Sequence, residues 1–123
     1  MNVYCAGPKV LYYDSEGGSM TSMEDMAEVA RISFPFAIVF NPQTQPNETM
    51  DWYIQKVRDS DVLVFRRCCS ESRFTAGVGL EVETAQKMKK KIYEFHEGLL
   101  IPWKGRVVSM SRDETNEHFR MCH

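Results

Sequence analysis

The feature that most constrains the fold of this 123-residue chain is an almost uniformly apolar run, DVLVF at 61–65. A run this short and this apolar is typical of a strand buried on both faces, as strands of parallel sheets are. Apolar runs at 2–6, 36–40, 91–95 and 106–110 predict further strands. We therefore expect about five strands in one sheet.

Segments with the helical spacing of apolar residues separate these strands. The expected inner faces are Met23, Met26, Ala27 and Ala30 of a first helix, Met50, Ile54 and Val57 of a second, and Val78, Val82, Ala85 and Met88 of a third that runs from about Leu80 to Lys90. Thr21 and Glu24 have the spacing of a capping box, and Ser111 is placed to cap a last helix.

This alternation of strands and helices predicts an α/β fold. We expect residues 1–123 to form a single-domain, doubly wound sheet of the flavodoxin or Rossmann kind, with about five parallel strands and helices on both faces. In such sheets ligands bind beyond the carboxyl ends of the strands. The loops at those ends are 7–19, 41–49, 66–79 and 96–105.

Charge and cysteine content exclude several function classes. The net charge of -2 gives no general reason to expect a nucleic acid polymer as partner, and no apolar stretch is long enough to span a membrane. The cysteines have no metal-site spacing; they are Cys5, Cys68, Cys69 and Cys122. We expect free thiols in a reducing cytoplasm and no bound metal.

The segment TAGVGLEVETA, at 75–85, carries the chemistry. Glu81 is expected in the first turn of the third helix, where the helix dipole favours an ionised carboxylate. Such a carboxylate can attack an anomeric carbon and form a covalent sugar ester, which a second acceptor then displaces with net retention. Gly77 and Gly79 would let a ligand approach the backbone, and the amides there could hold a phosphate together with Thr75. Alternatively, Glu81 only complements the dipole.

Three separated segments together resemble the nucleoside 2-deoxyribosyltransferase superfamily, including its nucleotide N-hydrolase branch. They are VYCAGP at 3–8, DSDVLVF at 59–65 and GVGLEVETAQKMKKKIYEF at 77–95. The resemblance implies cleavage or transfer of the N-glycosidic bond of a nucleoside or nucleoside 5′-monophosphate. It also implies a covalent glutamate intermediate, no cofactor, and a homodimer or higher homo-oligomer.

Carried over position by position, the resemblance makes Glu81 the nucleophile and Tyr4 the residue that orients it. Gly7, with the adjacent Pro8, would admit the sugar or phosphate, and Thr75 would contact the 5′-phosphate. Core packing is the alternative for Tyr4, and helix capping is the alternative for Thr75.

One position departs from the family pattern. Tyr53 stands where the family usually has an aspartate that protonates the leaving base or binds the sugar. Asp51 is the nearest carboxylate, and it would either reach the pocket or only cap the second helix. Asn41 could read a base edge with its amide or simply form a turn. The same fold without turnover, as a nucleotide-binding module or a flavodoxin-like binder of another ligand, stays an alternative.

Overall fold

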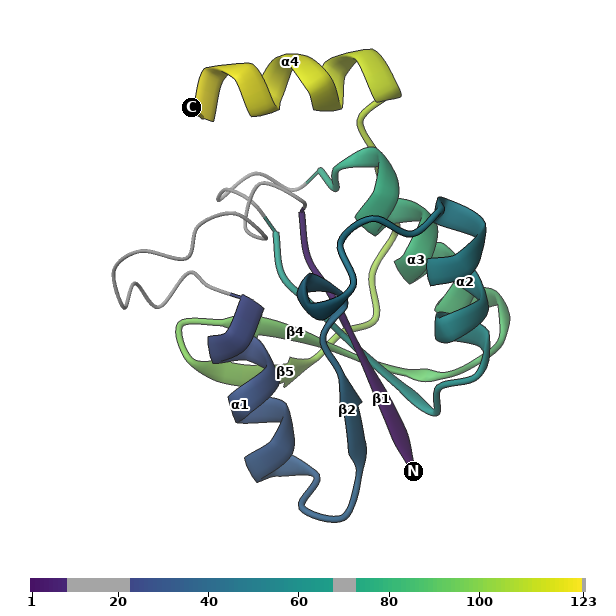
Figure 1. Ribbon diagram of the computed structural model, residues 1–123, viewed down its shortest axis with the longest axis vertical. Helices are drawn as coiled ribbons and strands as arrows, with labels where there is room; N and C mark the ends of the chain where they lie inside the picture. Colours follow the sequence, from purple (N-terminus) through teal and green to yellow (C-terminus); the bar gives the residue numbers. More distant parts are fainter. Residues whose placement is uncertain (9–22, 68–72, 123) are drawn as a thin grey trace.

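The computed structural model describes residues 1–8, 23–67 and 73–122, and shows an α/β fold built on one sheet (Figure 1). Its elements are β1 (Asn2–Ala6), α1 (Met23–Ser33), β2 (Ile38–Phe40), the 3-10 helix η2 (Pro42–Thr44), α2 (Met50–Arg58), β3 (Val62–Phe65), α3 (Ala76–Lys87), β4 (Lys91–His96), β5 (Leu99–Pro102) and α4 (Arg112–Cys122). Thr21, predicted to start the first capping box, lies outside the described residues.

The sheet has five strands in the order β2-β1-β3-β4-β5. β1 pairs in parallel with both β2 and β3, and β3 pairs in parallel with β4. All four residues of β3 are buried, as the uniformly apolar sequence predicts. The prediction of parallel pairing is therefore confirmed for four strands.

The fifth strand differs from the prediction in place and direction. It is Leu99–Pro102, which runs antiparallel to β4, and not 106–110. Glu97 and Gly98 form the connection between the two strands, and both have positive φ values, of 50° and 78°. Positive φ at both loop residues is what a two-residue type I′ hairpin requires, and glycine adopts it without a steric cost. The sheet is therefore mixed.

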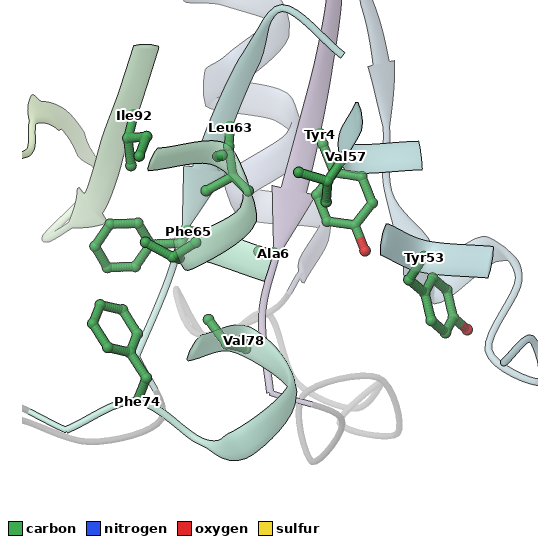
Figure 2. Packing of buried hydrophobic residues seen from close by; sticks show 11 residues of the cluster. Tyr4, Ala6, Tyr53, Val57, Leu63, Phe65, Phe74, Val78 and Ile92 are labelled. Carbon is green, nitrogen blue, oxygen red and sulfur yellow. The ribbon is translucent and has the colours of Figure 1, made fainter. Parts of the chain in front are cut away.

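Helices cover both faces of this sheet because the side chains of each strand alternate. Val3 and Cys5 of β1 point to the face covered by α1, where they pack with Met23, Met26, Ala27 and Ala30. Tyr4 and Ala6 point to the face covered by α2 and α3 (Figure 2). The predicted inner faces of the helices are confirmed with two exceptions. Met50, at the start of α2, is only partly buried, and Met88 is 46% exposed and ends α3.

Two helix starts are fixed by side-chain caps. Thr49 caps α2, since its Oγ1 accepts a hydrogen bond of 3.2 Å from the amide of Trp52. Ser111 and Glu114 form a reciprocal capping box at the start of α4, with bonds of 3.0 Å and 3.1 Å. The predicted role of Ser111 is thus confirmed. No helix among residues 1–8, 23–67 and 73–122 combines the length and apolarity needed to cross a bilayer.

Candidate active site

A cavity of about 310 Å³ lies beyond the carboxyl ends of β1 and β3. These neighbouring strands lead to helices on opposite faces of the sheet, and ligand crevices of α/β proteins form at such a point. The wall consists of Gly7 and Pro8 after β1, Glu48, Met50 and Tyr53 around the start of α2, Thr75, Ala76, Gly77, Val78 and Glu81 of the α3 region, and Arg112, Thr115 and Asn116 of α4. The volume is at the lower end of the range of roughly 300–1,000 Å³ usual for small-molecule sites.

Glu81 is a buried acidic residue of this wall. The side chain is only 5% exposed, yet the residue borders the cavity. Burial raises the pKa of Glu81 from 4.5 to about 8, because a carboxylate loses its hydration there. The hydrogen bond from Tyr4 acts in the opposite direction and lowers the pKa.

The surroundings of Glu81 differ from those expected of a carboxylate in a first helical turn. α3 begins at Ala76 and not near Leu80, so Glu81 lies more than one turn inside the helix. The field of the helix dipole falls off within that first turn. The expectation that the dipole keeps Glu81 ionised was wrong, because desolvation raises the pKa of this carboxyl group.

Tyr4 links β1, an inner strand of the sheet, to this carboxyl group. Its ring is fully buried on the α2 and α3 face of β1, and its hydroxyl donates a short hydrogen bond to Oε2 of Glu81. Figure 2 shows the Tyr4 hydroxyl directed away from the strand, toward the side of the sheet on which Tyr53 lies. Tyr4 therefore packs in the core and also bonds to Glu81, so its two alternative roles are compatible.

The amino end of α3 forms a second part of the wall. Thr75 is the N-cap residue but makes no side-chain capping bond. Oγ1 of Thr115, on α4, instead accepts a 2.9 Å hydrogen bond from the amide of Ala76. Gly77 and Val78 also lie in this first turn, where backbone N–H groups have no acceptor within the helix. Arg112, an exposed residue of α4, borders the same cavity.

Three residues predicted for the site lie elsewhere. Asp51 is an exposed residue of α2 that does not border the cavity and does not cap the helix, since Thr49 does. Asn41 is 4% exposed and accepts from the amide of Gln43 at 2.9 Å, so it caps η2. Gly79 faces Ser109, where a Cβ would come within 1.9 Å of the serine Oγ.

The structure also adds residues that the sequence did not indicate. Glu48, Arg112 and Asn116 border the cavity but belong to segments far from Glu81 in the chain. Of these, only Glu48 could have been found from the sequence, because it lies in the loop 41–49 at the carboxyl end of a predicted strand. The two α4 residues could not, since only tertiary packing places that helix against α3.

No family model matches this chain, and comparisons with curated proteins and with solved structures found no match either. Within the described residues, no three His, Cys, Asp or Glu side chains are grouped so that they could hold a metal ion.

Proposed function

We propose that this protein cleaves or transfers the N-glycosidic bond of a nucleoside or a nucleoside 5′-monophosphate, with a 2′-deoxy sugar as the expected substrate. The observation that carries the proposal is a buried glutamate, Glu81, which borders a small-molecule cavity and accepts a hydrogen bond from Tyr4. The strand order β2-β1-β3-β4-β5 is also that of flavodoxin-like doubly wound sheets, apart from the direction of β5.

In the proposed reaction an oxygen of ionised Glu81 attacks C1′ of the sugar. The C1′–N bond breaks, its electron pair goes to the base nitrogen, and a glycosyl ester forms on the glutamate. Water or a second base then attacks C1′ and releases the carboxylate, so that two inversions give net retention. Tyr4 holds Glu81 in place and favours its ionised form.

A 5′-phosphate would find suitable groups on the same wall. Gly77 and Val78, in the first turn of α3, and Arg112 all border one cavity. Helix amino ends and arginine side chains are the usual partners of phosphate groups. These groups support the monophosphate over the free nucleoside. The resemblance to the deoxyribosyltransferases further supports an enzyme that acts as a homo-oligomer without a cofactor, and the expectation of free thiols supports a cytoplasmic location.

Release of free base from deoxynucleoside 5′-monophosphates, followed by chromatography, tests the proposal. Glu81→Ala should abolish release while circular dichroism shows the fold retained. A 2′-fluoro-arabino nucleotide, whose fluorine slows hydrolysis of the ester, should leave a covalent adduct that mass spectrometry locates on Glu81. Undiminished release by the alanine variant, or an adduct on another residue, would remove Glu81 as the nucleophile.

A second candidate function is nucleotide binding without turnover. Two observations favour it: Tyr53 occupies the place of the expected acid, and a pKa of about 8 leaves Glu81 mostly protonated at neutral pH. Calorimetry that detects nucleotide binding in the absence of base release would identify this function.

A further inference from the structure

Departure of a nucleobase requires a proton as well as a nucleophile. When the C1′–N bond breaks, the base leaves as an anion unless an acid protonates it, and general acid catalysis typically contributes about 10²–10⁴-fold. Asp51 was the candidate from the sequence, with helix capping as its alternative, but it does not border the cavity. The acid has therefore to be sought among the groups that border the cavity.

Four ionisable side chains of the described residues border it: Glu48, Tyr53, Glu81 and Arg112. Glu81 carries the ester and cannot also deliver the proton. Arg112 keeps its protons throughout, because a guanidinium is not deprotonated in proteins. The hydroxyl of Tyr53 already donates to the backbone carbonyl of Gln45, which ties up its proton. Glu48 is the remaining group.

We propose that Glu48 is the general acid of the glycosidic step, an assignment that rests on the proposed N-glycosidase function. Its carboxyl proton goes to the departing base as the electron pair of the C1′–N bond moves onto the base nitrogen. The resulting Glu48 carboxylate takes a proton from the attacking water, or from the incoming base, as C1′ is freed from Glu81. The acid is thereby restored at the end of each turnover.

The backbone on both sides of Glu48 is held in place, which such a role requires. On one side, the backbone carbonyl of Gln45 accepts a hydrogen bond from the Tyr53 hydroxyl. On the other side, Thr49 caps α2, with its carbonyl accepting from the amide of Tyr53 at 3.2 Å. One residue of α2 thus fixes both ends of the short segment that carries Glu48.

The two glutamates differ in their surroundings. Glu81 is buried and bonded to Tyr4, whereas Glu48 is exposed to solvent at the cavity wall. A bound base would cover Glu48 and exclude water from it, and the loss of water favours the neutral form of a carboxyl group. A pair of carboxyl groups in different environments on one cavity is the general arrangement of retaining glycoside hydrolases.

The leaving group distinguishes an acid from a merely structural residue. We would compare Glu48→Gln with the wild type on two substrates: 2′-deoxyguanosine 5′-monophosphate, and its N7-methylated derivative, whose base leaves as a neutral molecule without a proton. The variant should lose about 10²–10⁴-fold in kcat on the first substrate and no more than a few-fold on the second. Glu83→Gln, which alters an exposed carboxylate paired with Lys87 outside this cavity, serves as the matched control and should leave both rates unchanged.

Equal losses on both substrates, or no loss on either, would overturn the role of Glu48. If Asp51→Asn, and not Glu48→Gln, lost kcat on the unmethylated substrate alone, the acid would be Asp51. A wild-type protein that releases base from neither substrate would instead refute the N-glycosidase function, and the role of Glu48 with it. Equal thermal midpoints for the wild type and Glu48→Gln would show that the variant is folded.

Discussion

Tyr4 on β1 donates a hydrogen bond to Glu81 on α3, across 77 positions of the chain. The bond joins an inner strand of the sheet to the helix whose start borders the cavity, and it links the protonation of Glu81 to the packing of the core. The four predictions that follow concern this pair and the packing of α3 around it.

Tyr4→Phe keeps the buried ring and removes only the donor to Glu81. Hydrogen bonds to charged groups contribute about 1.5–3 kcal/mol, so kcat/KM for base release at pH 7 should fall about 10- to 100-fold. The lost bond lowered the pKa of Glu81, so the rising limb of the pH–rate profile should move to higher pH. A pH–rate profile whose rising limb lies at the same pH in the variant would contradict the orienting role of Tyr4.

Stability should fall as the pH rises, because the folded chain binds a proton at Glu81 that the unfolded chain releases. The pKa is raised from 4.5 to about 8, so this contribution is fully present below about pH 4.5 and is lost as the pH rises to about 8. Within that window a single such group changes the free energy of unfolding by roughly 1 kcal/mol per pH unit. Urea denaturation of Glu81→Gln, compared with the wild type at several pH values, should show a flatter dependence. Equal slopes would mean that Glu81 does not hold the proton.

Two glycines of α3 should respond in opposite ways to the same substitution. In Gly79→Ala the new Cβ would come within 1.9 Å of Oγ and 3.0 Å of Cβ of Ser109, so we expect a loss of about 1–3 kcal/mol. In Gly77→Ala the Cβ meets only Met50 Sδ at 3.8 Å, so helix propensity should give a gain of up to about 1 kcal/mol.

Thermal unfolding of the two glycine variants measures this difference. Replacing Ser109 by glycine as well should restore most of the stability lost in Gly79→Ala. Because Gly77 borders the cavity, its alanine variant should nevertheless bind nucleotide more weakly. A Gly79→Ala protein as stable as the wild type would show that α3 does not pack closely on 106–110.

Thr115→Val removes the hydroxyl that caps α3 and keeps the shape of the side chain. The amide of Ala76 then loses its partner, and we expect a cost of about 1 kcal/mol, as for other N-caps. Thr75→Val is the matched control, since the Thr75 side chain makes no capping bond and should matter less to stability. Denaturant midpoints for the two variants test the assignment, which equal losses would contradict.

Local patterns in the sequence predicted much of this fold. Uniform apolarity located β3, and helical spacing located the buried faces of α1 and α2, because burial on one or both faces leaves a short-range pattern. The segments around Tyr4 and Glu81 were identified by their resemblance to one family. Their proximity was what that resemblance implied.

Other features have no short-range pattern. The run 106–110 is as apolar as many strands, but it makes only an isolated bridge at Ser109, while a hairpin through Gly98 supplies the fifth strand. The protonation of Glu81 depends on how completely tertiary packing excludes water, which the sequence does not encode locally. The same holds for the cap from Thr115, which replaces the one expected of Thr75.

The position of α4 couples local unfolding of this helix to ligand binding in the cavity. Its first residues cap α3 and border the cavity, so detachment of this helix would expose the Ala76 amide and open the wall. A nucleotide that contacts Arg112 or Asn116 would bind only to the attached form, and slower hydrogen exchange in α4 would report its presence.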